Sequence, residues 1–159
     1  MIRVIFFWFL MMILHAVSSY AQSGNTLTFQ QLDSLQQIEK KPVLVFIHTQ
    51  WCRYCRAMEH TTFQNEEVQA WLDSAFYWVA LDAEAQHNIT IGGQTFGYQP
   101  TGPDAGQHEL ARVLGQIDGK LTFPTLCYLN ADYEIIYQQT GFIRAEELVA
   151  TLKVLSSTI

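Results

Sequence analysis

Apolar residues follow two different spacings along the chain, and these spacings predict its helices and strands. In some segments they recur every three or four residues, which is the period of one helical face. In others they form short continuous runs rich in strand-forming residues. The helical spacing covers 28–39, a segment that starts near 52, breaks near 61–62 and resumes after 65, and the segments 108–114 and 145–155. The strand-like runs are 43–47, 76–81, 125–129 and 134–138.

The order of these elements predicts an α/β fold. A strand, a helix and a strand within 43–81 have the length that makes a right-handed parallel crossover. The polar turn 130–132 then predicts an antiparallel hairpin between the last two strands, and the final helix covers it. Together these elements predict a central mixed β-sheet flanked by helices. If the third strand runs antiparallel to the first, Pro124 lies close to Cys52.

The segment between the second and third strands is less regular, and it predicts an insert from about 84 to 106. Gly92-Gly93 separates Ile89-Thr90-Ile91 from Gln94-Thr95-Phe96, which is the signal of a two-residue hairpin turn. Residues 99–106 are rich in proline and glycine and are expected to form a loop. Because the insert leaves the sheet at the edge that carries the cysteines, we expect its hairpin, with Phe96 and Tyr98, to help choose a protein partner. The alternative is a surface loop without a role.

The first residues have the composition of a secretory signal peptide. Arg3 precedes an apolar run from 4 to 14, and small residues stand at Ser19 and Ala21. The run is shorter than the roughly 20 apolar residues that cross a bilayer. We therefore expect residues 1–21 to be a signal peptide, residues 22–159 to form one domain, and the protein to be exported. An uncleaved membrane anchor is the alternative.

The charge of the chain narrows the classes of partner. It has 9 Lys and Arg residues against 15 Asp and Glu residues, a formal net charge of −6. Removal of residues 1–21 takes away only Arg3 among the charged residues, which leaves 8 basic and 15 acidic side chains and a charge of −7. No run of five basic residues is present. Nucleic acids and acidic membrane surfaces are therefore not expected partners.

Three cysteines supply the candidate chemistry. Cys52 and Cys55 lie three apart where an apolar strand passes into a helix, so they can form a disulfide across one helical turn. The first of them lies at the helix N-terminus, where free backbone N–H groups and the helix dipole stabilise a thiolate. One tight pair plus one isolated cysteine favours a redox centre over a disulfide scaffold. Cys127, within an apolar strand, is expected to be a buried, inert thiol.

Two other interpretations of the pair stay open at this stage. One is a metal site. A zinc site usually needs four ligands, and the chain has no second Cys-x-x-Cys motif to supply them. Copper(I), however, could bind the two thiolates and a flanking histidine, His48 or His60. The other is a static structural disulfide. His48 is otherwise expected to be a packing residue at the end of a strand. His60, His87 and His108 are expected to lie on the surface.

Two separate motifs give the chain a resemblance to the thioredoxin superfamily. Trp51-Cys52-Arg53-Tyr54-Cys55 follows an apolar strand, and Phe123-Pro124-Thr125 opens a later one. The resemblance covers roughly residues 28–156. The stretch from Cys52 to Glu59, with 62–68 after it, is similar to the C-terminal periplasmic domain of the transmembrane thiol–disulfide interchange reductase. The resemblance implies a thioredoxin fold in which the insert lies before the strand that follows a cis-proline.

The resemblance also implies roles for the residues around the pair. Cys52 would be the attacking thiol and Cys55 the buried resolving thiol. Pro124 would be the cis-proline whose backbone holds a substrate chain beside the cysteines. The residues expected to contact the substrate are Trp51, Arg53, Tyr54, Phe123 and Pro124. The disulfide itself is the only redox group expected, with no further cofactor and no metal.

Two positions depart from the thioredoxin pattern. Thioredoxins carry a buried Asp six residues before the first cysteine, and Phe46 stands there. Tyr54 stands where many thioredoxins have Pro. The interchange-reductase domains have a Glu four residues after the second cysteine, and Glu59 matches it. Glu59 is therefore the expected carrier of the proton that Cys55 loses, and an exposed helix residue without a role is the alternative.

These expectations combine into one function. The chain is expected to be a thiol–disulfide oxidoreductase that reduces protein disulfides in the bacterial periplasm through a mixed disulfide on Cys52. Its expected partners are protein thiols and disulfides and an upstream electron-donor protein, with a membrane-bound donor among the candidates. The alternatives are a disulfide oxidase or isomerase, and a thioredoxin-like module that binds copper or a partner without redox turnover.

Overall fold

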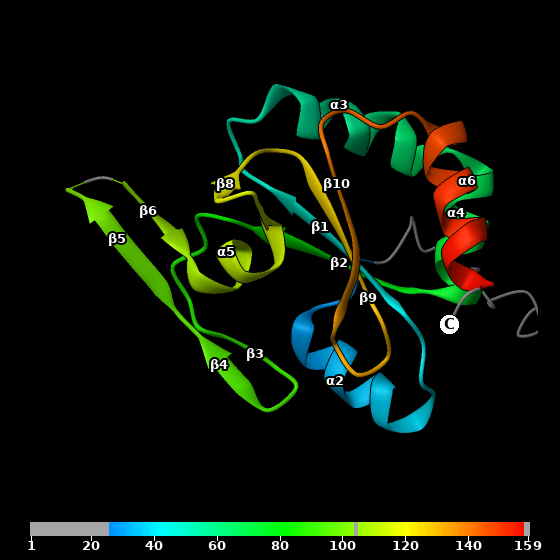
Figure 1. Ribbon diagram of the computed structural model, residues 1–159, viewed down its shortest axis with the longest axis horizontal. Coiled ribbons are helices and arrows are strands. Elements are labelled where there is room, and N and C mark those ends of the chain that lie inside the picture. Colours follow the sequence, from blue (N-terminus) through cyan, green and yellow to red (C-terminus); the bar gives the residue numbers. More distant parts are fainter. Residues whose placement is uncertain (1–25, 104, 158–159) are drawn as a thin grey trace, which may run out of the picture.

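The computed structural model describes residues 26–103 and 105–157 of the chain (Figure 1). Its helices are α2 (Phe29–Ile38), α3 (Arg53–His60), the 3-10 turn η1 (Thr62–Gln64), α4 (Glu66–Ala75), α5 (Glu109–Gly115) and α6 (Ala145–Ser156). Its strands are β1 (Val43–His48), β2 (Tyr77–Asp82), β3 (Ile89–Ile91), β4 (Gln94–Phe96), β5 (Tyr98–Gly102), β6 (Ala105–His108), β7 (Gln116–Ile117), β8 (Lys120–Leu121), β9 (Thr125–Leu129) and β10 (Ile135–Thr140). The predicted signal peptide, residues 1–21, lies outside the described residues. Within the described ranges, no helix is long and apolar enough to cross a membrane.

A four-stranded mixed sheet forms the centre of the domain. Its strand order is β10-β9-β1-β2. β1 runs parallel to β2, whereas β9 runs antiparallel to both β1 and β10. Ile47 near the end of β1 pairs with Thr125 at the start of β9. The end of β1 and the residue before β9 therefore meet at one sheet edge, as the sequence predicts.

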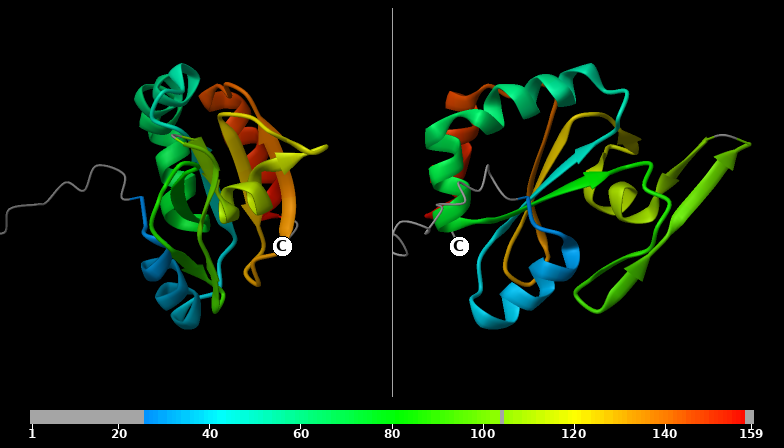
Figure 2. Two further views of the ribbon diagram at one scale, coloured as in Figure 1. Left: turned by 90° about the vertical axis from the view of Figure 1, so that its left-hand side faces the viewer. Right: turned by 180° about the vertical axis from the view of Figure 1, so that it is seen from behind.

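Helices cover both faces of this sheet (Figures 1 and 2). Val43, Val45 and Ile47 of β1 point into a core that also holds the buried residues of α2 and α5. Leu44 and Phe46 point into the opposite core, which they share with α3, α4 and α6. β1 is buried on both faces, which is the arrangement that its continuous apolar run predicts. The predicted α/β architecture with a mixed, helix-flanked sheet is confirmed.

The helices begin where side chains can accept the free backbone N–H groups of a first turn. Thr28 and Gln31 form a reciprocal capping box at the start of α2. Asn65 accepts the N–H groups of Glu67 and Val68 at 3.0 and 3.2 Å, so it caps α4 as its position in the sequence predicts. The turn η1, between α3 and α4, is the predicted interruption of the long helical segment.

The insert between β2 and α5 consists of two consecutive hairpins. β3 and β4 pair across Gly92-Gly93, which confirms the first of them. β5 and β6 form a second hairpin within the stretch predicted to be a loop, so that prediction is wrong. A glycine is needed in β6 because Tyr98 lies directly against Gly106, where a Cβ would not fit. Figure 1 shows the second hairpin extending away from the sheet.

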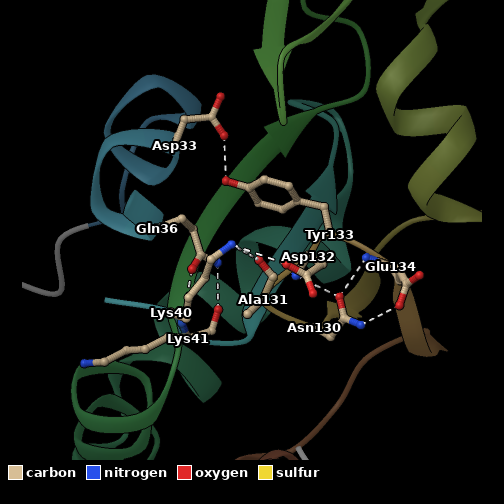
Figure 3. Close-up of polar contacts among 9 residues, drawn as sticks. All are labelled: Asp33, Gln36, Lys40, Lys41, Asn130, Ala131, Asp132, Tyr133 and Glu134. Carbon is tan, nitrogen blue, oxygen red and sulfur yellow. Dashed lines mark hydrogen bonds and ion pairs between the residues drawn. The ribbon is translucent and has the colours of Figure 1, made fainter. Parts of the chain in front are cut away.

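Polar contacts fasten the first hairpin to the domain at the sheet edge opposite the cysteines. Tyr133, in the turn between β9 and β10, donates its hydroxyl to Asp33 of α2 at 2.6 Å (Figure 3). The same carboxylate oxygen accepts the N–H of Gly92 at 3.1 Å. Nearby, Lys40 forms an ion pair with Asp132 at 3.3 Å. These contacts join α2, the β3–β4 turn and the β9–β10 turn into one corner of the domain.

Candidate active site

The Cys52–Cys55 pair lies at the sheet edge where β1 and β2 end and β9 begins. Cys52 is the N-cap residue of α3. Its backbone N–H donates to the carbonyl of Thr49 at 3.2 Å, and this bond closes the turn between β1 and the helix. The local sequence thus passes from a buried strand through one tight turn into a helix that begins at the cysteines.

The two cysteines form a disulfide with an S–S distance of 2.01 Å and a Cα–Cα distance of 5.2 Å. Cys55 is completely buried in the first turn of α3, whereas the Cys52 residue is 5% exposed to solvent. The N–H of Cys55 donates to the sulfur of Cys52 at 3.1 Å. After reduction, this donor and the positive end of α3 would both favour a thiolate on Cys52. Cys52 therefore has the better access and the better charge environment for attack on a disulfide.

An aromatic pair borders the disulfide. Trp51 is 63% exposed, and its ring lies edge-to-face with that of Phe123, with 5.9 Å between the ring centroids. The Phe123–Pro124 peptide bond is cis, as the resemblance implies. Pro124 is buried directly before β9, the antiparallel neighbour of β1. The structure thus brings Trp51, Phe123 and Pro124 to the same sheet edge as Cys52.

Sequence reasoning missed one residue at this edge, Glu84. Its carboxylate accepts the indole N–H of Trp51 at 3.0 Å. The backbone N–H of Glu84 in turn donates to the carboxylate of Asp82 at 2.9 Å. A signal for Glu84 was available in the sequence, because it comes just after the end of a strand predicted to run parallel to β1. The ends of parallel strands meet at one sheet edge.

Arg53 and Tyr54 occupy the first turn of α3, between the two cysteines. Both are exposed, Tyr54 to 65%. The neighbouring Arg56 is held by a hydrogen bond to the carbonyl of Gln50 at 3.1 Å. Arg53 and Tyr54 are therefore open to a molecule that approaches the disulfide from solvent, and their contact with a substrate stays a prediction.

Phe46 stands where thioredoxins carry a buried Asp, so an apolar ring lines this part of the site. Its ring is 1% exposed, lies edge-to-face with Phe63 at 4.9 Å and stacks on His48 at 5.2 Å. Glu59 is half-buried on α3, one turn after Cys55. Phe46 and Glu59 both line a pocket of about 220 Å³ between α3, α4 and β2. The role of Glu59 in proton transfer stays a prediction.

The third cysteine lies apart from the pair. Cys127 is fully buried in β9, as expected, and burial raises its pKa to about 12. Its thiol therefore stays protonated in the folded protein. Within the described part of the chain, no group of three or more His, Cys, Asp or Glu side chains is placed to hold a metal ion.

The prediction that His108 lies on the surface is wrong. The ring is completely buried and serves as the N-cap of α5. Its Nδ1 accepts the N–H of Leu110 at 3.2 Å, and its Nε2 lies 3.1 Å from the carbonyl oxygen of His87. The insert packs over this position, and that packing buries a residue whose local sequence is polar. His60 and His87 are exposed, as expected.

Comparison with known proteins identifies the family of the chain. Residues 29–156 match the family described as a thioredoxin-like domain. Because this match covers most of the chain, the chain belongs to the thioredoxin-like domain family. No curated protein matches its sequence.

Several solved structures share its fold. A thioredoxin from Thermus thermophilus superposes with a TM-score of 0.59 at 20% identity, over 84% of this chain and 88% of that one. A putative disulphide-isomerase from Bacteroides thetaiotaomicron gives 0.57 at 22% identity, over 86% and 93%. The reduced C-terminal domain of DsbD from Neisseria meningitidis gives 0.51 at 16% identity, over 79% and 90%. These likenesses confirm the thioredoxin-like fold. The chain is thus a thioredoxin-like protein whose Cys52–Cys55 disulfide is consistent with thiol–disulfide oxidoreductase chemistry.

Proposed function

We propose that the chain is an exported oxidoreductase that reduces protein disulfides in the bacterial periplasm. One observation carries this proposal: Cys52 caps a helix at the sheet edge, is bonded to a buried Cys55 and lies at the same edge as Pro124. The fold is shared with the C-terminal domain of DsbD, which has been solved in its reduced and oxidised forms. Export is proposed from the composition of residues 1–21.

The reducing reaction needs only the two thiols of the pair. The Cys52 thiolate attacks one sulfur of a substrate disulfide and forms a mixed disulfide, and the other substrate sulfur leaves as a thiolate. Cys55 then loses its proton and attacks the sulfur of Cys52. This step restores the Cys52–Cys55 disulfide and releases the second substrate thiolate. Two electrons have passed to the substrate, and the dithiol of an electron-donor protein must replace them.

Glu59 is the proposed acceptor of the Cys55 proton. It lies one turn along α3 from Cys55, and the pocket that it lines has room for water. Glu59→Gln should therefore slow resolution of the mixed disulfide on Cys52 without slowing its formation, and Glu66→Gln, an exposed control, should change neither step. Rapid-quench measurement of the two steps separates them. An unchanged resolution rate would leave Glu59 as a surface residue.

The test of the proposed function is capture of its partners. Cys55→Ser, made together with Cys127→Ser, should accumulate mixed disulfides on Cys52, which mass spectrometry identifies. A control that also carries Cys52→Ser should capture nothing. The proposal fails if the Cys55→Ser protein captures no partner and Cys52 titrates like a free thiol, with a pKa of about 8.5.

The direction of electron flow is tested by the reduction potential of the pair. Proteins that use this chemistry span roughly −270 to −120 mV. Equilibration of the protein with glutathione buffers measures its value. A potential near the lower end supports a reductase, whereas one near the upper end would make the protein an oxidase and overturn the proposed direction.

The insert is proposed to help select the protein partner. Phe96 and Tyr98 lie where its two hairpins join, and the second hairpin extends away from the sheet (Figure 1). Deletion of residues 88–98 should slow the reaction with a captured partner but not the reduction of a small synthetic disulfide. Unchanged kinetics with the partner would leave the insert without this role.

A further inference from the structure

A groove along the outer edge of β2 lies outside the disulfide chemistry described above. It is bounded by β2, by α2 along its length, and by the chain that leads into β3, and its volume is about 780 Å³. We propose that this β2 groove binds an extended, basic segment of a partner protein, which pairs with β2 as an added strand. Figure 2 (right) shows β2 at the edge of the sheet, with α2 beside it and the insert beyond its end.

The backbone of β2 directs hydrogen-bonding groups into this groove. The N–H of Tyr77 points toward β1 and donates to a carbonyl just before that strand at 2.9 Å. The backbone groups of the next residue, Trp78, point away from β1, and its carbonyl accepts the N–H of Leu27 at 3.0 Å. Backbone groups alternate between the two sides of a strand. Those of Ala80 and Asp82 therefore also face outward.

Only part of this outer edge is unpaired within the described residues. Leu27 forms an isolated bridge there, and the chain then leaves the edge because Thr28 caps α2. The carbonyl of Asp82 accepts the N–H of Ala85 at 3.1 Å. The N–H of Asp82 and the carbonyl of Ala80 are left for an added strand. Open strand edges of this kind are the template on which extended peptides dock.

The charges around the groove select the kind of segment that fits it. Asp33 of α2 and Asp82 of β2 line it together with His48 and His87, and no lysine or arginine does. Asp33 uses one carboxylate oxygen for Tyr133, and its other oxygen points away from that bond (Figure 3). Basic side chains on a docked segment would meet a carboxylate at two different points of the groove. The net charge of −6 on the chain attracts the same kind of segment.

The β2 groove reaches the end of β2, at the sheet edge that carries the disulfide. Asp82, at the end of the groove, accepts the backbone N–H of Glu84, and Glu84 accepts the indole N–H of Trp51. Trp51 directly precedes Cys52. The end of the groove is therefore linked through two hydrogen bonds to the residue that borders the reactive sulfur. The use of the groove by a thiol-bearing partner rests on the proposed function, whereas the binding of a strand does not.

The test uses the purified, oxidised protein and two pentapeptides without cysteine, acetyl-Val-Lys-Val-Lys-Val-amide and its counterpart with Glu in place of Lys. We expect the basic peptide to bind saturably, to shift the NMR amide signals of residues 80–82 and to slow hydrogen exchange at the N–H of Asp82. The acidic peptide should bind about tenfold more weakly. Added salt should weaken binding of the basic peptide, because its charge contacts are exposed.

Two matched variants locate the binding site. Gln37→Lys places a positive charge at the groove and should weaken binding of the basic peptide by about fivefold. Ile38→Lys adds the same charge one residue further along, outside the groove, and should leave binding unchanged. Both residues are exposed, Ile38 to 83%, so both variants should fold. Equal effects of the two variants would overturn the proposal.

Other outcomes would also overturn it. The first is the absence of saturable binding, and the second is a set of shifts centred on another strand edge, such as β10. The third is tighter peptide binding after deletion of residues 1–25, since the chain's own first residues would then occupy the edge. Because the peptides carry no thiol, loss of their binding leaves capture by Cys52 unaffected, and absence of capture leaves their binding measurable.

Discussion

His108 makes the stability of the domain depend on pH, and its contacts show in which direction. The ring is fully buried and neutral, since its Nδ1 accepts the N–H of Leu110 and its Nε2 then carries the proton that faces the carbonyl of His87. Burial lowers the pKa of His108 from its ordinary value of 6.5, and the His87 carbonyl and the Glu109 carboxylate oppose this only in part. Protonation at Nδ1 would have to break the bond from Leu110.

Acid therefore destabilises the folded state through this ring. As the pH falls below 6.5, His108 binds a proton in the unfolded chain but not in the folded one, until the pH reaches the lowered pKa. Within that window the loss in free energy of unfolding approaches about 1.4 kcal/mol per pH unit. Well above pH 6.5 the ring is neutral in both states, and its contribution to stability is complete.

The perturbations that test this reasoning are His108→Ala and His108→Asn. At pH 7.5, the alanine variant should lose about 3 kcal/mol, because it gives up a helix cap, a buried hydrogen bond and the packing of the ring. The asparagine variant can still cap α5 and should lose about half as much. Urea denaturation at pH 7.5 and 5.5 measures both the stability and its pH dependence.

The decisive quantity is the loss of stability between these two pH values. In both variants it should be smaller than in the wild type, by up to about 1.4 kcal/mol, because the titrating ring is gone. His60→Asn, which removes an exposed histidine, should keep the wild-type pH dependence. If the wild type and both His108 variants lose equal stability on acidification, the assignment of a neutral, buried ring is refuted.

Three further predictions concern the surroundings of the site. Glu84→Ala removes the acceptor of the Trp51 indole and should speed exchange of that N–H at a cost below about 1 kcal/mol, whereas Glu84→Gln should not speed it. Gly106→Ala forces a Cβ against a tyrosine ring and should speed amide exchange in β5 and β6 more than Gly102→Ala, whose nearest neighbour lies at 3.9 Å; equal rates would contradict the packing. Cys127 should resist alkylation at pH 8 until denaturant unfolds the domain, and its modification in the native protein would argue against its burial.

The body of the domain could be predicted because the contacts that bury its elements also leave a pattern in the sequence. The run 43–47 is apolar at every position because β1 is covered on both faces. The β5–β6 hairpin was not predicted, because Pro100 and the glycines around it are typical of loops. A two-stranded ribbon has free edges and tolerates a proline that a central strand would exclude.

The residues of the candidate site were likewise predicted only in part. Cys52 and Pro124 lie far apart in the sequence, yet each belongs to a local motif, and the sheet register then brings both to one edge. The hydrogen bond from Trp51 to Glu84 and the burial of His108 depend instead on how the insert folds over the sheet edge. Local sequence carries no periodic signal for those contacts, so a polar residue such as His108 was predicted to face solvent.

The two ends of the insert lie side by side, because the N–H of His108 donates to the carbonyl of Ala83 at 2.8 Å. Between them the chain forms both hairpins and returns to almost the same point. The entropic cost of closing a loop grows slowly with its length, so a long connection between these two points destabilises the fold little more than a short one. Ile89 and Ile91 of the first hairpin belong to the buried core, so this hairpin is part of the scaffold. The outer part of the β5–β6 hairpin is exposed, and a ribbon of another length or sequence could replace it there while the scaffold that carries the disulfide stays the same.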